Sequence, residues 1–216
     1  MLTEVLRNAI RQRPARRYEK KQFLWREGDR YSGLWLIKAG AVKTVCLTPK
    51  GDEQITGFYL PGEYPGIDDL PGGIHRGYAQ VIDDCAVHLL SPLQLEAHMD
   101  ASDVRREVYR LMSERLRQNQ RRLYELSRMS AGARLAGFIY DIASRYGLEG
   151  DVLRDFRLPM LRCDIANYTG LATETVTREM LKMVEAGAFR FSRRYISGLH
   201  PEMMNKLTRV GGIFSR

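Results

Sequence analysis

A run of about 25 residues without proline or glycine, 103–127, limits the folds open to this 216-residue chain. Apolar residues recur along it at spacings of three, four and seven: Val104, Val108, Leu111, Met112, Leu116, Leu123 and Leu126. This periodicity predicts one helix of about 40 Å. Because a small domain cannot cover so long a helix, it either bridges two domains or pairs with a second copy of itself. Its arginine-rich face is expected to be solvated, with a DNA-facing role as the alternative.

The hundred residues before this helix are rich in short β-forming runs separated by turns that contain glycine or proline. Two such runs, 41–47 and 54–60, flank the turn 49–52 and predict a hairpin. Strands that recur about every ten residues favour a β-sandwich or β-roll over alternating strands and helices. We expect a β domain, then the long helix, then a small helical domain.

Residues 161–187 have the spacing of a helix-turn-helix. The first helix carries the small residue Ala166 where a second helix would cross, and Gly170 follows at a turn position that tolerates positive φ. Val176 is placed to anchor the second helix, which is expected to begin near Thr173. The alternative is a plain pair of antiparallel helices whose charged face is solvated.

The first turns of that second helix are expected to present four polar residues on one face: Thr173, Glu174, Thr177 and Arg178. In the major groove an arginine donates to guanine, a glutamate accepts from cytosine, and a threonine contacts thymine or adenine. The set therefore predicts DNA reading. Glu179 stands where this motif usually has an apolar residue, so either the helix packs through Met180 and Leu181 or Glu179 has a basic partner.

A basic tip follows the motif. Residues 189–196 predict a two-stranded wing with Arg193 and Arg194 at its turn. Both arginines could contact DNA phosphates, which position a protein without specifying sequence; solvated turn charges are the alternative. The chain has 34 Lys and Arg against 26 Asp and Glu and a net charge of +8, which favours a polyanion as partner.

Cysteine usage and hydropathy favour an intracellular protein. The cysteines Cys46, Cys85 and Cys163 are widely separated and form no C-x-x-C pair, which argues against a disulfide scaffold or a zinc ribbon and suits a reducing cytosol. No apolar run is long enough for a transmembrane helix, and residues 1–20 lack the pattern of a secretion signal. We therefore expect a cytoplasmic chain without membrane contact.

A family resemblance extends over both halves of the chain. It is carried by the segments 51–68 (GDEQITGFYLPGEYPGID), 134–146 (RLAGFIYDIASRY) and 156–180 (FRLPMLRCDIANYTGLATETVTREM). These segments resemble the Crp/Fnr superfamily of bacterial transcription regulators, most closely its FNR and FixK branch. The resemblance implies an α+β chain: a double-stranded β-roll related to cyclic-nucleotide-binding domains in 1–100, a dimerisation helix in 101–130 and a winged helix-turn-helix in 131–216.

The same resemblance implies what the chain binds. Recognition helices of the FNR and FixK branch read DNA through the pattern E-x-x-S-R and favour TTGAT half-sites. Glu174 and Arg178 match this pattern, and Thr177 replaces Ser, keeping the hydroxyl and adding a methyl group. The resemblance implies a homodimer on a TTGAT-like palindrome of double-stranded DNA, RNA polymerase as a partner, and control of genes for low-oxygen or nitrogen-oxide metabolism.

The first domain departs from the cyclic-nucleotide-binding members of the family. Those members have a glutamate after a glycine and an Arg-Ser or Arg-Thr pair before an alanine. Here Ile67 follows Gly66, and Arg76 is one place out of register before Ala79. A cyclic phosphate without its aligned arginine would be poorly paired, so we expect no cyclic AMP binding unless a shifted loop brings Arg76 back.

We expect no cofactor. Three separated cysteines cannot supply the four thiolate ligands of an iron–sulfur cluster. Haem needs only one axial histidine, for which His75, His88 and His98 are candidates, although a lone histidine is more often packed or exposed. A haem- or small-ligand-dependent regulator of the same fold is the alternative, as is activity set by the abundance of the protein.

Cys163 is a candidate redox site, because Arg162 and a helix N-terminus favour its thiolate while Asp164 opposes it; an incidental thiol is the alternative. An enzyme is not expected, because the four histidines are isolated and no Ser/His/Asp grouping or phosphate-binding loop is evident. A cyclic-nucleotide-binding module that does not read DNA is the remaining alternative.

Overall fold

The structure, a computed structural model, describes residue 10 and residues 13–70, 72–149, 152–153 and 155–209. The chain divides into two compact units, Met1–Asn119 and Gln120–Arg216. One helix, α3 (Ser102–Arg128), runs through the boundary between them and confirms the predicted long helix. The predicted division at 100 and 130 stays a prediction.

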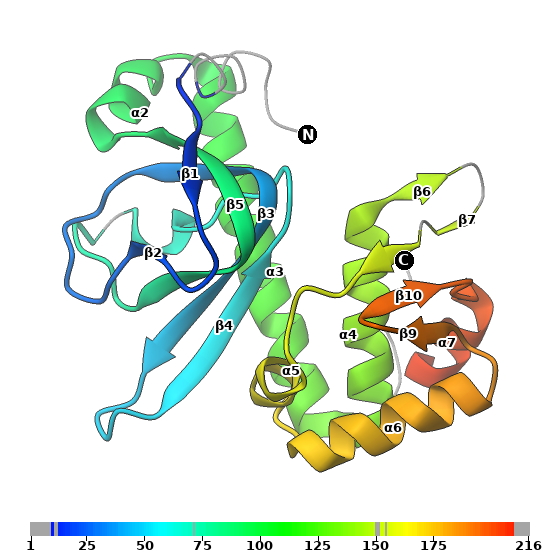
Figure 1. Cartoon of the computed structure of the whole chain (residues 1–216). Helices are drawn as coiled ribbons and strands as arrows, with labels where there is room; N and C mark the ends of the chain where they lie inside the picture. The colour runs from blue at the N-terminus through cyan, green and yellow to red at the C-terminus, as the bar shows by residue number, and fades with distance from the viewer. Residues whose placement is uncertain (1–9, 11–12, 71, 150–151, 154, 210–216) are drawn as a thin grey trace. The chain divides into compact units, whose positions relative to one another are not determined.

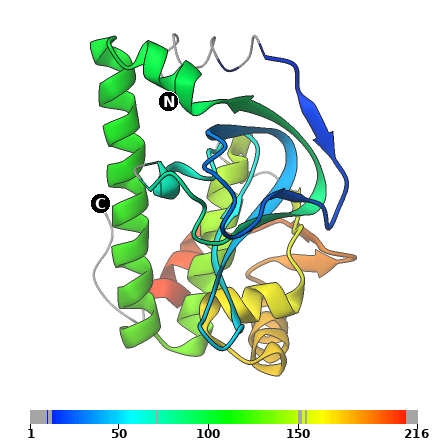
Figure 2. The ribbon, with the colours of Figure 1, turned by 90° about the vertical axis from the view of Figure 1, so that its left-hand side faces the viewer.

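The first unit is built on an antiparallel sheet that is strongly curved (Figures 1 and 2). Its strands are β1 (Arg16–Tyr18), β2 (Phe23–Trp25), β3 (Leu34–Leu47), β4 (Glu53–Tyr59) and β5 (Tyr78–Leu90). They are ordered β1-β5-β3-β4, and β2 also pairs with β5. The pairing of β3 with β4 confirms the predicted hairpin.

Bulges give the sheet its curvature. The register of β3 against β5 shifts three times between Ile37 and Val42, and extra residues on one strand bend a sheet. Gly40 lies at this bend with φ 82°, and a Cβ at this position would be 2.1 Å from the carbonyl oxygen of Asp84. Only glycine can therefore occupy the bend without displacing β5.

Helices close one side of the roll. After the short η1 (Ile67–Asp69) and α2 (Pro92–His98), the first turns of α3 bury Val104 and Val108 against Leu34 and Leu90. A second cluster, which includes Trp25, Trp35 and Val81, fills the interior of the roll. Farther along α3, Leu116 and Leu123 are 60% and 68% exposed in the single chain.

The second unit combines helices with two small sheets (Figure 1). Its elements are α4 (Ala131–Tyr146), β6 (Leu148–Glu149), β7 (Val152–Leu153), β8 (Phe156–Arg157), α5 (Arg162–Thr169), α6 (Thr173–Glu185), β9 (Arg190–Ser192), β10 (Tyr195–Ser197) and α7 (Pro201–Arg209). A three-stranded sheet has the order β8-β10-β9, and β6 pairs with β7. Leu135 and Ile139 of α4, Val176 of α6 and Ile196 of β10 are fully buried, and α4 packs against α6.

Both ends of α4 have a local cause. The helix begins at Ala131, because the hydroxyl of Ser130 accepts from the Ala133 N–H and caps it. Gly147, with φ 89°, ends it. Across the described parts of the chain, no helix is both long enough and apolar enough to span a membrane.

Candidate DNA-binding surface

The turn between α5 and α6 has the predicted geometry. Gly170 follows α5 in the left-handed region (φ 63°, ψ 40°), and the N–H of Leu171 donates back to the Ala166 carbonyl at 2.9 Å. Val176 is fully buried and anchors α6, while Ala166 is 4% exposed beneath it. These three positions confirm the helix-turn-helix spacing.

The first two turns of α6 carry the four residues predicted to read DNA. Thr173, Glu174 and Arg178 are exposed, and Thr177 is half-buried. The Thr177 hydroxyl donates to the Thr173 carbonyl at 3.1 Å, which leaves its oxygen as an acceptor and its methyl group as an apolar contact. No side chain caps the N-terminus of α6, so its first N–H groups and its positive end suit an anionic backbone.

Glu179 is held by basic partners. It is 15% exposed, and it accepts from Lys182 Nζ at 2.9 Å and from Arg178 Nε at 3.4 Å. The hydrogen bond from Lys182 is the main reason why the pKa of Glu179 is lowered. The other alternative was that α6 packs through Met180 and Leu181. Met180 is buried, whereas Leu181 is 55% exposed. The basic-partner prediction is confirmed, and the packing prediction holds for Met180 and is wrong for Leu181.

The wing tip is a two-residue hairpin turn. Arg193 (φ 47°) and Arg194 (φ 73°) both have positive φ, a conformation that hairpins usually give to Asn-Gly. Arg193 is exposed. Arg194 instead turns inward, where its NH2 donates to the carbonyl oxygens of Pro159 and Met160 at 3.3 and 3.1 Å. The two predicted phosphate contacts therefore have different surroundings in the DNA-free chain.

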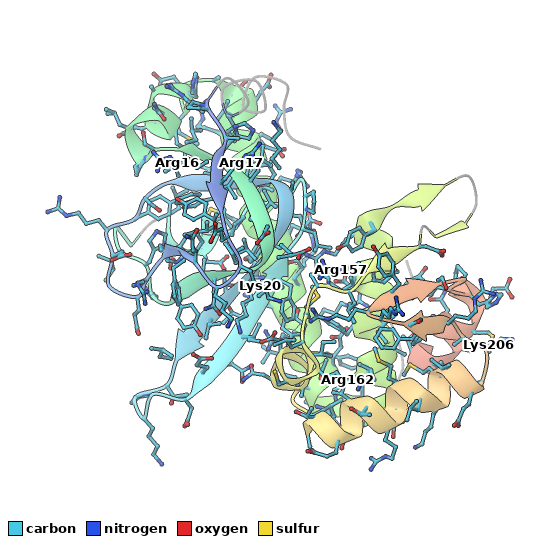
Figure 3. The ribbon with its side chains drawn as sticks, viewed as in Figure 1. Arg16, Arg17, Lys20, Arg157, Arg162 and Lys206 are labelled. Carbon is cyan, nitrogen blue, oxygen red and sulfur yellow. The ribbon has the colours of Figure 1, made fainter. Side chains whose placement is uncertain are left out.

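A third basic residue lies near the wing. Arg162 is exposed in the first turn of α5 (Figure 3), and its guanidinium carbon is 5.9 Å from the ring centroid of Phe191 in β9. From the sequence, Arg162 was predicted only to favour the thiolate of Cys163. The available signal was its position at the start of a predicted helix. The positive end of the helix dipole repels a cation there, so the guanidinium is expected to interact with another group.

The cysteines differ in their surroundings. Cys163 is exposed in the first turn of α5, next to Asp164, whose carboxylate accepts from the Leu161 N–H at 3.1 Å. Asp164 is thus an N-terminal cap of α5. Cys85 is buried, and burial followed by the charge of Asp83 raises the pKa of its thiol to about 12. The redox role of Cys163 stays a prediction.

The segment after Gly66 does not fit a cyclic phosphate. Arg76 is exposed, so a shifted loop does not bring its side chain inward. Two carboxylates lie in this segment instead: Asp68 forms an ion pair with Arg115 at 2.9 Å, and Asp69 accepts from His75 Nδ1 at 2.9 Å. Since carboxylates repel a phosphodiester, the residues present argue against a cyclic nucleotide here.

A Ser/His/Asp chain that the sequence analysis did not find is present in the roll. The Ser32 hydroxyl donates to His75 Nε2 at 2.9 Å, and His75 Nδ1 donates to Asp69 at 2.9 Å. His75 is fully buried and stacked on Trp25 at 4.4 Å, and the Trp35 indole N–H donates to the Ser32 oxygen at 2.9 Å. Ser32 itself is half-buried, and this chain of hydrogen bonds joins three separate segments of the roll.

The remaining histidines have no shared site. His88 is 6% exposed, and its Nδ1 donates to the Arg13 carbonyl at 2.7 Å. His98 is half-buried at the end of α2. Within the ranges that the structure describes, no group of three or more His, Cys, Asp or Glu side chains could hold a metal ion.

Comparison with known proteins gives the family. Residues 15–101 match the cyclic nucleotide-binding domain family, and residues 133–207 match the Crp-like helix-turn-helix domain family. The fumarate and nitrate reduction regulatory protein of Escherichia coli K12 is 35% identical over 183 residues, which cover 83% of this chain and 72% of that protein. The anaerobic regulatory protein of Aggregatibacter actinomycetemcomitans is 34% identical over 181 residues, which cover 83% of this chain and 70% of that protein.

Solved structures give the same fold. FixK2 from Bradyrhizobium japonicum matches with a TM-score of 0.82 and 27% identity over 94% of this chain and 98% of that chain. A CRP-family transcriptional regulator from Thermus thermophilus matches in fold alone, with a TM-score of 0.68 and 21% identity. The match covers 89% of this chain and 96% of that chain. A β-roll, a long helix and a winged helix-turn-helix in this order define a DNA-binding transcription regulator. The chain belongs to the Crp/Fnr family.

Proposed function

We propose that this regulator reads a TTGAT-like palindrome as a homodimer, through Thr173, Glu174, Thr177 and Arg178. The observation that carries the proposal is the face of α6, where Glu174 and Arg178 are both exposed one helical turn apart. Four residues along a helix rise about 6 Å, so the two side chains can reach neighbouring base pairs. Glutamate accepting from cytosine and arginine donating to guanine would select these pairs.

The exposed apolar face of α3 supports the homodimer. Leu116 and Leu123 are seven residues apart, and further large side chains on this face are exposed at spacings of three and four: Tyr109, Met112 and Leu126. This is the a/d pattern of a coiled coil, with Asn119 in the remaining position. A two-fold dimer places its recognition helices about one DNA turn apart, which requires a palindrome.

Phosphate contacts complete the proposed interface. Arg193 at the wing tip is exposed, so its guanidinium is accessible to a phosphate. To contact a phosphate, Arg194 would have to give up its hydrogen bonds to two carbonyl groups. We therefore expect its phosphate contact to be weaker than that of Arg193. Arg162, exposed at the start of α5, is a further phosphate contact that we add to the predicted set.

The remaining assignments follow from the family. We assign residues 1–100 to a sensor-like domain, 101–130 to dimerisation and 131–216 to DNA binding. We propose that the protein is cytoplasmic, has no catalytic activity or membrane contact of its own, and acts with RNA polymerase. The printed names of two relatives, anaerobic regulatory protein and fumarate and nitrate reduction regulatory protein, support control of genes for low-oxygen or nitrogen-oxide metabolism.

Fluorescence anisotropy of the purified full-length protein tests the proposal. A labelled TTGAT palindrome and a scrambled duplex of the same composition are titrated at two salt concentrations. We expect binding to the palindrome to be at least about 1,000-fold tighter than to the scrambled duplex. Equal affinity for both duplexes would contradict sequence-specific reading, and sedimentation of the complex as one protein per palindrome would contradict the homodimer.

A further inference from the structure

The C-terminal end of α5 is held by two arginines from other helices. The last carbonyl groups of a helix have no partner within it. Arg122 of α3 donates through NH2 to the Tyr168 carbonyl at 3.0 Å, and Arg134 of α4 donates through NH1 to the carbonyls of Thr169 and Gly170 at 2.9 and 3.3 Å. Two cations thus meet the negative end of α5, where the helix dipole favours them.

Two further contacts fix the direction of α5 relative to α3. The Arg122 guanidinium lies over the ring of Tyr168, 4.0 Å from its centroid, so both the plane and the position of this group are set. One turn later on α3, Leu126 Cδ2 lies 3.0 Å from where a Cβ on Gly170 would be. From one face of α3, Arg122 therefore contacts the end of α5, and Leu126 contacts the turn that follows it.

We infer that Arg122 and Arg134 are positioning residues that fix α6 relative to the end of α3 and thereby set the half-site spacing that the dimer accepts. This inference rests on the proposed function. In a dimer paired through α3, the angle between α3 and the helix-turn-helix decides how far apart and at what twist the two α6 helices lie. One base pair of extra separation moves the second half-site by about 3.4 Å and turns it by about 35°. Only a rigid connection resists such a change.

Arg121 provides a matched control. It is the neighbouring residue on α3 and carries the same charge, but its Nε donates to Glu125 of its own helix at 2.8 Å. Arg122→Gln and Arg121→Gln each remove one positive charge from the same helical turn, so we expect any general electrostatic effect on DNA binding to be of similar size. Arg122→Lys keeps the charge and loses the planar stacking on Tyr168.

The test measures binding to a series of TTGAT palindromes whose half-site separation differs by one base pair. Wild type and Arg121→Gln are expected to bind the best separation at least about tenfold more tightly than its neighbours. Arg122→Gln and Arg134→Gln are expected to lose about tenfold at the best separation and to bind adjacent separations within about threefold of one another. Arg122→Lys is expected to lie between these results.

Hydrogen exchange without DNA gives a second readout. In Arg122→Gln, the amides of Gly170 and Leu171 should exchange about tenfold faster, while Arg121→Gln leaves them unchanged. Circular dichroism confirms that each variant is folded; should Arg122→Gln not fold, Arg122→Lys takes its place. A steep spacing preference retained in the folded Arg122 variant would overturn the inference. A wild type that does not distinguish palindrome from scrambled DNA would instead overturn the proposed function.

Discussion

Arg115 of α3 and Asp68 of the segment after Gly66 form an ion pair in which Nε lies 2.9 Å from Oδ2. The arginine NH2 also donates to the Thr56 carbonyl of β4 at 3.3 Å, and its guanidinium carbon lies 5.6 Å from the Tyr59 ring centroid. One side chain thus joins α3, β4 and the loop around η1 within the first unit.

Removing this arginine should destabilise the first unit. Because Asp68 is 44% exposed and the Thr56 carbonyl can reach water, we expect Arg115→Gln to lower the free energy of unfolding by about 1–2 kcal/mol. Chemical denaturation monitored by tryptophan fluorescence measures this free energy of unfolding, because Trp25 and Trp35 lie in the roll. Arg117→Gln, at an exposed site two residues along α3, is the control. Equal losses in both variants would contradict the role of the ion pair.

The base contact of Arg178 should be specific. Arg178→Ala is expected to weaken binding to the palindrome by about 1–3 kcal/mol and to relax selectivity at one base pair. Lys182→Ala is the control, because Lys182 also donates to Glu179 and carries the same charge on the same helix. It should weaken specific and scrambled DNA by the same small factor. A DNase footprint and base preference unchanged in Arg178→Ala would argue against base reading by this side chain.

Arg193 allows charge and turn geometry to be separated. Asparagine tolerates positive φ, so Arg193→Asn should keep the hairpin turn and remove the charge. We expect binding to all duplexes to weaken alike and the slope of log affinity against log salt to decrease by about one. The thermal midpoint should be unchanged or higher. A loss confined to one base pair would show base reading instead of phosphate contact.

Acid should weaken the second unit through Glu179. The pKa of this carboxyl is lower in the folded chain than its ordinary 4.5, chiefly because of the Lys182 hydrogen bond. Its contribution to stability is therefore present at pH above 4.5 and is lost as the pH falls through the lowered value. Unfolding measured between neutral and acid pH should show a smaller acid loss in Glu179→Gln than in wild type. Glu185→Gln, at an exposed site on the same helix, should behave as wild type.

The three thiols should react at different rates. Cys163 and Cys46 are both exposed, but desolvation and then the charge of Asp69 raise the pKa of Cys46. Cys85 is buried, and desolvation raises the pKa of its thiol to about 12. Because the thiolate is the reactive form, iodoacetamide at neutral pH should label Cys163 first, Cys46 more slowly and Cys85 only after unfolding. Peptide mass spectrometry gives the order. Rapid labelling of Cys85 in the folded chain would show that the roll opens.

The long helix and the helix-turn-helix were predictable because their signals are local. Gly170 and Val176 each do what their spacing requires, the first by its positive φ and the second by its burial. The strand pair β6 and β7 was not predicted. Strands of two residues carry no periodic pattern, so only the pairing itself reveals them.

The long-range contacts lay beyond the sequence patterns. His75 meets Ser32 across 43 residues, and Arg122 meets Tyr168 across 46. Arg194 was predicted to contact a DNA phosphate, with a solvated turn charge as the alternative, yet in the DNA-free chain it donates to carbonyl groups 34 and 35 residues earlier. No local periodicity encodes such pairs, because they depend on how the elements pack. Arginines are especially hard to assign, since a free and a bonded guanidinium look alike in a sequence.

Gly40 has a consequence for how mutational screens of this regulator are interpreted. A Cβ there would overlap the Asp84 carbonyl, so every replacement damages the roll. In a screen scored by reporter expression, Gly40 variants will be as inactive as variants of the DNA-reading face, although Gly40 belongs to the other unit. A map of inactive positions therefore mixes loss of protein with loss of recognition, and only parallel measurement of cellular protein levels separates the two.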